Sequence, residues 1–178
     1  MATVLTNILA ELSDLFFSSL DELGHFEPVQ AEALPDEHQS LLAHHDHMTV
    51  TLEAWHNSLV DVRVLEEKRE KDLYARNILL ALQRDGSVVQ FGIMHINLAG
   101  LPDIVRLEIE SQALPLGRIM IRHHLLREVE LCQLWRVIPG PRLQFHLKVE
   151  EDLPLYARTA RILLKGNPVV MLLEIVNA

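Results

Sequence analysis

The stretch LYARTARILLKGNPVVMLLEIV, Leu155–Val176, predicts two β-strands joined by a tight turn at 165–168. The glycine and asparagine of this KGNP turn tolerate positive φ, and its proline cannot donate a ladder hydrogen bond, so it marks a strand start. The second strand is almost wholly apolar except for Glu174. Burying a lone carboxylate costs several kcal/mol, so we expect Glu174 to be paired, hydrogen-bonded or lining a cavity.

Length and composition indicate one globular domain over residues 1–178, with 49% hydrophobic and 23% charged residues. The net charge of -9 argues against a nucleic-acid-binding surface. Cys132 is the only cysteine, which excludes an intramolecular disulfide and a thiolate zinc site. The N-terminus lacks a basic region before its apolar residues, and no long uncharged apolar run occurs. We therefore expect a cytoplasmic protein without membrane insertion.

The N-terminal part, at about 3–56, predicts helices. Apolar residues recur there at three- and four-residue spacing, namely Leu5, Ile8, Leu9, Leu12, Leu15 and Phe16. Gly24 and Pro28 are expected to end this helical region. Pro35 opens a second helix, which we expect to continue without a break into HHDHMTVTLEAW.

The remainder, 57–178, is predicted to be mainly β with one short helix at 102–111, whose buried face would carry Ile104, Leu107 and Ile109. The predicted strands are 59–65, LYARNILLAL at 73–82, 88–93, 129–138, an additional candidate at 143–149, and the terminal hairpin. The charge run 66–72 is interpreted as a solvated connection. Helix remains an alternative for 70–83, because leucine, alanine, arginine and lysine all favour it. Scarce helices between strands predict an α+β fold with an antiparallel sheet and helices packed on one side.

Histidine clusters raise the question of a metal site at His44, His45, Asp46 and His47. Neighbouring residues on a helix point in different directions, so this spacing fails to supply fixed ligand geometry, and a surface or capping role is favoured. Cys132 has no evident base beside it, and no glycine-rich phosphate loop is present. The sequence therefore predicts neither a metal nor an organic cofactor.

Arginines inside apolar strands are the other candidates. Arg76 is the one charge in LYARNILLAL and requires an anionic partner. That partner is either a carboxylate on a neighbouring strand or a ligand carboxylate held by the planar guanidinium. Arg158 and Arg161 lie three positions apart, so they face opposite sides of their strand, and at most one of them reaches a pocket.

Four stretches, in order, resemble the chorismate pyruvate-lyase family and its shorter lyase-like relatives. They are the DHMT segment at 46–49, the LYARNILLALQRDG strand and turn, LPLGRIMI from Leu114, and the terminal hairpin. Together they span about three quarters of the chain. The resemblance implies a chorismate lyase-like fold.

The resemblance also implies a reaction, the elimination of pyruvate from chorismate to give 4-hydroxybenzoate without metal or cofactor. Arg76 would hold the ring carboxylate, and Glu174, its pKa raised by burial, would assist departure of the enolpyruvyl group. Met48 and Leu116 would offer backbone groups to the substrate, and Arg158 would add a second cation. The expected partner is thus chorismate or a related aromatic carboxylate.

Two alternatives remain open beside the lyase. One is a non-catalytic protein that binds a small aromatic acid on the same fold, like the effector domains of certain transcription regulators. The other is a structural protein in which Arg76 and Glu174 pair with neighbouring residues. The oligomeric state is open too, and a homodimer is compatible with the sequence.

Overall fold

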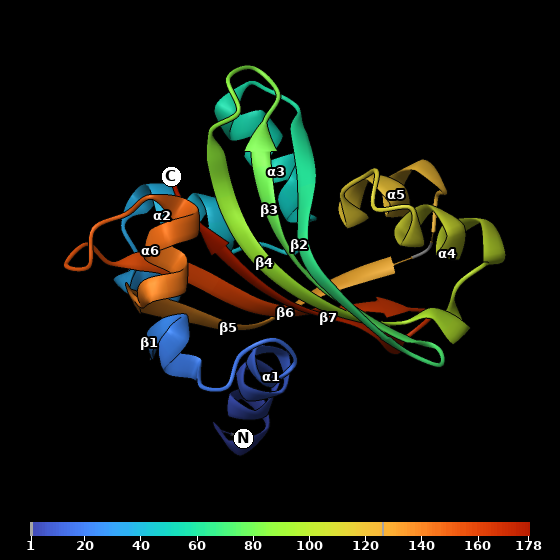
Figure 1. Ribbon diagram of the computed structural model, residues 1–178, viewed down its shortest axis with the longest axis horizontal. Coiled ribbons are helices and arrows are strands. Elements are labelled where there is room, and N and C mark those ends of the chain that lie inside the picture. The colour runs from blue at the N-terminus through green and yellow to red at the C-terminus, as the bar shows by residue number, and fades with distance from the viewer. Residues whose placement is uncertain (1, 126) are drawn as a thin grey trace.

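A computed structural model describes residues 2–125 and 127–178, and the side chains of 8–125 and 127–178. Its centre is one seven-stranded sheet in the order β1-β5-β6-β7-β4-β3-β2, with every neighbouring pair antiparallel (Figure 1). The strands are β1 (Gly24–Val29), β2 (Val60–Glu70), β3 (Leu73–Leu82), β4 (Val88–Asn97), β5 (Arg127–Pro139), β6 (Leu155–Leu164) and β7 (Asn167–Val176). The helix alternative for 70–83 is thereby excluded.

Helices surround this sheet. The α-helices are α1 (Ala2–Asp14), α2 (Asp36–Leu42), α3 (Met48–His56), α4 (Asp103–Glu110), α5 (Leu116–Arg122) and α6 (Pro141–Leu147). Short 3₁₀ turns are η1 (Leu20–Glu22), η2 (Ala31–Ala33) and η3 (Leu98–Gly100). Within the described residues, no helix has the length and apolar character needed to cross a membrane.

Two three-stranded meanders, β2-β3-β4 and β5-β6-β7, meet where β4 pairs with β7, and β1 adds the seventh strand beside β5. The segment that contains α4 and α5 connects the meanders. The terminal hairpin β6–β7 therefore lies at the middle of the sheet, as a strongly apolar pair of strands should. Its turn uses positive φ at Lys165 (51°) and Gly166 (81°), which is one residue earlier than the sequence indicates.

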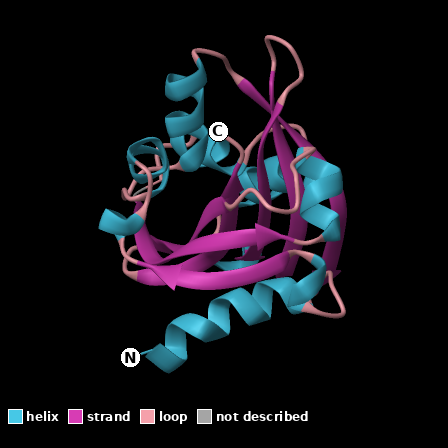
Figure 2. Cartoon of the chain, turned by 90° about the vertical axis from the view of Figure 1, so that its left-hand side faces the viewer, coloured by secondary structure: helices cyan, strands magenta, loops and turns pink. Residues whose placement is uncertain are grey.

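Each face of the sheet carries its own apolar core. Helices α2 to α5 cover one face, and residues such as Leu42, Leu52, Ile109 and Ile119 fill the core beneath them. Helix α1 runs across the opposite face (Figure 2), where Leu12 joins residues of α6 in a second core. The predicted α+β class, with an antiparallel sheet and helices packed on one side, is confirmed, and α1 and α6 add cover to the other side. The side chain of Leu5 lies outside the described residues.

The sequence interpretation needs correction in the N-terminal part. The sequence predicts that a helical region ends at Gly24 and Pro28. In the structure these residues belong to strand β1, which pairs with β5. The continuous helix expected after Pro35 is two helices, α2 and α3, separated by residues 43–47. The break arises from tertiary contacts, since a buried arginine of β6 binds backbone carbonyls of this loop.

The C-terminal part also differs from the prediction. The charge run 66–70 belongs to edge strand β2, where charged residues deter pairing with other chains. The candidate strand at 143–149 is wrong, because Pro141 in the first turn and left-handed Lys148 at the end delimit helix α6 there. Helix α4 is confirmed, but Ile104 and Leu107 are exposed, and Val105 and Ile109 face the core.

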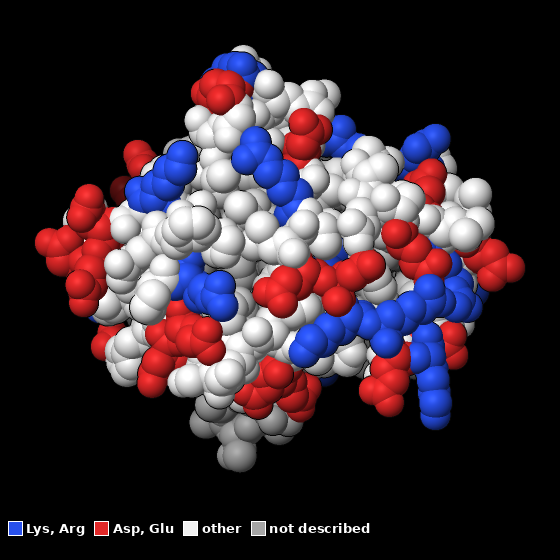
Figure 3. Space-filling model, viewed as in Figure 1, with Lys and Arg blue, Asp and Glu red and all other residues white. Residues whose placement is uncertain are grey.

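Charges are mixed over the surface. On the face shown in Figure 3, acidic and basic side chains are interspersed, and a row of basic side chains at the lower right is bordered by acidic ones. Several charges of the described residues are paired, for example Arg69 with Glu110 and Arg136 with Glu27. Exposed pairs of this kind contribute little to stability.

Candidate functional site

A small, partly open cavity lies between the centre of the sheet and the first turns of α3 and α5. Its volume is about 30 Å³, room for roughly two water molecules. Its lining residues come from α3, α5 and strands β3, β4, β6 and β7: His47, Met48, Thr49, Ile78, Leu80, Gln90, Met94, Pro115, Leu116, Gly117, Ile162, Leu172 and Glu174.

The floor of the cavity follows the two-residue alternation of the central strands. In β4, Gln90, Gly92 and Met94 share the face toward α3 and α5. Gly92 lies opposite Glu174 of β7 in the ladder. A Cβ at Gly92 would stand 3.3 Å from Gln90 Nε2 and 3.4 Å from Ile78 Cγ1. The missing side chain at this position therefore helps to leave the space between Gln90, Met94 and Glu174.

The roof is formed where the first turns of two helices meet. Met48 begins α3 and Leu116 begins α5, and both residues line the cavity. The helices approach closely at Gly117, where a Cβ would lie 2.9 Å from Thr49 Oγ1. Any larger residue at 117 would separate the two helices, so this glycine keeps the roof closed.

Glu174 has a partner within the protein. Arg158, its ladder partner in β6, donates from Nε to Glu174 Oε2 at 2.6 Å. The other nitrogens of Arg158 donate to the carbonyl oxygens of His44 at 3.1 Å and Asp46 at 3.0 Å. Arg158 is 1% exposed. It therefore forms a satisfied buried ion pair that also fixes the loop between α2 and α3.

His44 and His47 of this loop act as neutral hydrogen-bonding groups. His44 Nε2 lies 2.7 Å from the Leu41 carbonyl, and its Nδ1 accepts from the Asp46 backbone N–H. Burial, with a further contribution from Arg158, lowers the pKa of His44. The His47 ring accepts a hydrogen bond from Arg127 Nε. Burial first, then Arg127 and Arg158, lower the pKa of His47 to about 4.

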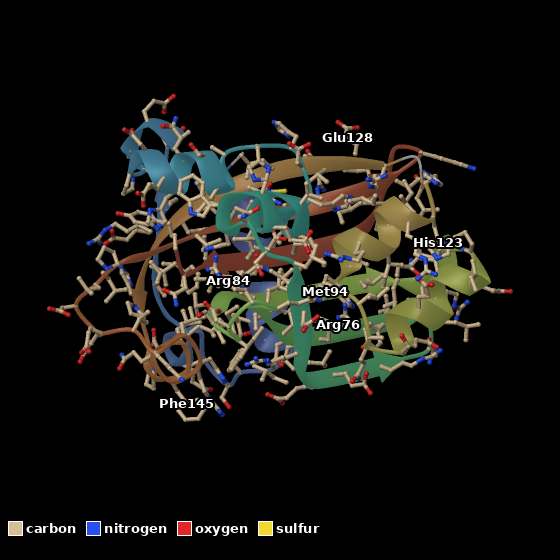
Figure 4. The ribbon with its side chains drawn as sticks, turned by 90° about the horizontal axis from the view of Figure 1, so that it is seen from above. Arg76, Arg84, Met94, His123, Glu128 and Phe145 are labelled. Carbon is tan, nitrogen blue, oxygen red and sulfur yellow. The ribbon has the colours of Figure 1, made fainter. Side chains whose placement is uncertain are left out.

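Arg76 of β3 is also buried, but its hydrogen-bond partners differ from those of Arg158. Its side chain is 0% exposed, and Nε contacts Met94 Sδ at 3.3 Å. Its terminal nitrogens donate to the carbonyl oxygens of Ile109 and Leu114, both at the long distance of 3.4 Å. Figure 4 shows Arg76 and Met94 next to one another in the middle of the molecule. Among the described residues, no carboxylate lies within ion-pair distance of Arg76.

The surroundings of Arg76 leave its charge weakly compensated. Burial lowers the pKa of Arg76, while Tyr74 and the more distant Glu67 oppose this effect. Glu67 is the ladder partner of Arg76 in β2, but its carboxylate accepts from the Tyr74 hydroxyl and the Gln112 amide. Burial and the bond to Glu67 raise the pKa of Tyr74, so the hydroxyl stays neutral beside the guanidinium.

The structure separates the predicted site residues into three groups. Met48, Leu116 and Glu174 line the cavity, whereas Arg158 lies behind Glu174 and Arg76 lies behind Met94. Arg161 is on the opposite face of β6 from Arg158 and pairs with Glu130 at 2.7 Å, and neither arginine lines the cavity. Within the described residues, no group of histidine, cysteine and acidic side chains is arranged to hold a metal.

Sequence reasoning missed Gln90. It is 3% exposed, it lines the cavity, and its Oε1 has no hydrogen-bond partner. The signal was available, because Gln90 is the lone polar residue in VVQFGIM. The same signal drew attention to Arg76 and Glu174.

Comparison with known proteins relates this architecture to solved structures. No family model matches the sequence, and no curated protein matches it. The effector domain of PhnF from Mycobacterium smegmatis is similar with a TM-score of 0.55 and 8% identity, over 75% of this chain and 89% of that chain. The structure of PhnF itself gives a TM-score of 0.53 and 8% identity, over 96% and 94%. At this identity the likeness shows the fold alone, a fold shared with the effector domain of PhnF.

These comparisons correct the predicted function. The chain resembles an effector domain and the protein that carries it, not an enzyme, so the expectation of a chorismate pyruvate-lyase that releases 4-hydroxybenzoate is contradicted. The site offers a physical reason. Glu174, the expected acid, is the hydrogen-bond acceptor of a buried arginine at 2.6 Å. The predicted fold is thus retained, while the comparisons do not support the predicted reaction.

Proposed function

We propose that this chain is a non-catalytic binding domain for a small organic acid, with Arg76 as the anchor of the ligand's carboxylate. The observation that carries the proposal is the state of Arg76. The guanidinium is 0% exposed, donates to two carbonyls at 3.4 Å and to a thioether, and has the Tyr74 hydroxyl beside it, but among the described residues no carboxylate lies within ion-pair distance. Buried charges are ordinarily paired, so this one is suited to receive its counter-ion from outside.

The present partners of Arg76 are ones that a ligand can displace. A thioether sulfur is a weak acceptor, and hydrogen bonds of 3.4 Å are long. A carboxylate that accepts two parallel N–H bonds from a guanidinium is a considerably stronger partner. The exchange of Met94 for a ligand carboxylate at Arg76 Nε is therefore favourable in a site shielded from water.

Ligand entry requires the cavity to expand. Its volume of about 30 Å³ is far below the roughly 300–1,000 Å³ of ligand pockets. Met94 is the natural movable part, because it separates Arg76 from the cavity and its unbranched side chain has several rotatable bonds. The Leu114 carbonyl is tied to Arg76 and lies directly before the roof residues Pro115 and Leu116. Movement of Arg76 toward a ligand thus also loosens the roof.

The remaining polar groups suit an acid of modest size. Met48 and Leu116, at the first positions of α3 and α5, are proposed to contact the ligand. Glu174 is neutralised by Arg158, so this pair adds no net charge that would attract or repel an anion. The effector domain of PhnF, which has a similar fold, supports a binding role over catalysis.

Benzoate and benzamide provide a direct test, because they have the same shape and only benzoate is charged. We expect titration calorimetry to detect benzoate binding and no comparable benzamide binding. Replacing Arg76 by Met should abolish benzoate binding, while Arg161→Met, a surface arginine on the opposite face, should leave it unchanged. Chorismate should release no pyruvate above background.

Two results would contradict this proposal. Equal affinity of the wild-type protein for benzoate and benzamide would remove the carboxylate anchor. Undiminished benzoate binding by the Arg76→Met variant, in a protein that unfolds cooperatively in urea, would place the anion elsewhere.

A further inference from the structure

The amide of Gln90 is the buried polar group in the cavity whose bonding is incomplete. It is 3% exposed, and its Oε1 is inaccessible to solvent and has no partner. A buried polar atom without a partner costs free energy, which a protein core normally avoids. The ladder places Gln90 opposite Leu80 and Val176, so the strands on either side supply only apolar side chains at this level.

Gln90 is aimed at the same space as Glu174. Both residues line the cavity, and Glu174 lies opposite Gly92, which is two residues from Gln90 in β4. Oε2 of Glu174 accepts from Arg158, and no described donor bonds to Oε1. The carboxylate can only accept hydrogen bonds, whereas the amide of Gln90 can turn either its oxygen or its NH₂ group toward a ligand.

We infer that Gln90 is a ligand-recognition residue whose amide, together with Glu174, selects organic acids that carry a second hydrogen-bonding group. This inference rests on the proposed function, which places the ligand's carboxylate at Arg76 beyond Met94. In β4 the distance from Met94 to Gln90 is four residues, about 13 Å along the strand. A ligand held by its carboxylate near Met94 therefore extends toward Gln90 over Gly92. Its other end is expected to carry a hydroxyl, amino or amide group, which could donate to Oε1 of Glu174.

Asn77 provides a matched control. It is 1% exposed in β3, and its Oδ1 is likewise buried without a partner. It lies on the opposite face of the sheet from Arg76, because it is adjacent to Arg76 in the strand, and it does not line the cavity. An effect on ligand choice should therefore follow substitution of Gln90 and not of Asn77.

The test compares the three aminobenzoates with the three corresponding methylbenzoates, since amino and methyl groups are similar in size. In the wild-type protein we expect at least one aminobenzoate to bind about tenfold more tightly than its methyl counterpart, the effect of one buried hydrogen bond. Gln90→Met should reduce this preference to about threefold or less, and Asn77→Leu should keep it. Arg76→Met should abolish binding of all six compounds.

The outcomes separate the two proposals. An aminobenzoate preference that survives in Gln90→Met overturns the role of Gln90 while the anchor at Arg76 stands. The role of Gln90 is also overturned if the wild-type protein shows no preference for aminobenzoates over methylbenzoates while Arg76→Met abolishes binding. If none of the six compounds binds the wild-type protein, both proposals fail.

Urea denaturation provides a second test that needs no ligand. Gln90→Met should raise the urea midpoint, because the substitution removes an unpaired buried amide. A lower midpoint would show that the amide has a structural partner.

Discussion

Arg76 and Arg158 are two arginines of the same sheet face with almost the same burial, 0% and 1% exposed, and opposite electrostatic circumstances. Arg158 lies opposite Glu174 in the ladder and binds it at 2.6 Å. Arg76 lies between Glu67 and Met94, but the Glu67 carboxylate is engaged by Tyr74 and the Gln112 amide. Arg158 is thus part of the framework of the fold, whereas the guanidinium of Arg76 remains able to bind a carboxylate.

This difference teaches that burial alone does not distinguish a structural charge from a functional one. Both arginines sit in apolar strands and both are hydrogen-bonded. The distinguishing quantity is the quality of the acceptors, a carboxylate and two carbonyls near 3 Å for Arg158 against a thioether and two carbonyls at 3.4 Å for Arg76. Four measurements can sharpen or break this comparison.

Removing Arg158 should have the largest effect. We expect Arg158→Met to lower the free energy of unfolding by about 3–5 kcal/mol, because Glu174 is left as an unpaired buried charge. Urea denaturation followed by circular dichroism measures this change. The double variant Arg158→Met with Glu174→Leu should recover most of the loss. A single variant as stable as the wild type would show that the pair is not a framework element.

Acid should weaken the neighbourhood of Arg158 through His47. Its pKa is about 4 in the folded protein and about 6.5 when unfolded. The folded state therefore binds fewer protons between these values, and stability falls as pH drops from about 6.5 to about 4. A difference of about 2.5 pKa units corresponds to about 3 kcal/mol. Unfolding at pH 7 and pH 4 should show this loss in the wild type and a smaller one in His47→Gln. Identical pH profiles would exclude His47 as its source.

Tyr74 should contribute less, through its bond to Glu67. Tyr74→Phe removes a hydroxyl that donates to Glu67 Oε2 at 2.9 Å, and we expect a loss of about 1 kcal/mol. A double-mutant cycle with Arg76→Met measures whether this hydroxyl also supports the guanidinium. A coupling of zero would separate the Tyr74–Glu67 pair from Arg76.

Arg76→Met should have the smallest effect on stability, within about 1 kcal/mol of the wild type. No carboxylate is left unpaired by the change, and an apolar side chain of similar length removes a poorly compensated buried charge. Thermal or urea unfolding without ligand is the measurement. A loss as large as that of Arg158→Met would abolish the contrast and identify Arg76 as a structural residue.

Much of the sheet could be predicted from the sequence. Alternation and turn residues gave β3, β4, β5 and the terminal hairpin, because strand periodicity and tight turns are local properties. The errors fall where tertiary contacts prevail. The loop between α2 and α3 exists because Arg158 binds the carbonyls of His44 and Asp46, and no local pattern announces that contact. The segment 141–147 is a helix although its residues also suit a strand.

The candidate site residues divide in the same way, into what local sequence predicts and what tertiary contacts decide. The sequence by itself determined that Arg76, Glu174 and Arg158 are charges in apolar strands, since such residues stand out against their neighbours. It also determined the α+β class, because hairpin-connected strands require antiparallel pairing. Only the tertiary structure decided that Glu174 belongs to Arg158 and that Arg76 faces Met94. Strand register sets those partners, which lie 16 residues apart for Arg158 and Glu174 and 18 for Arg76 and Met94, and register depends on which face of each strand the rest of the fold buries.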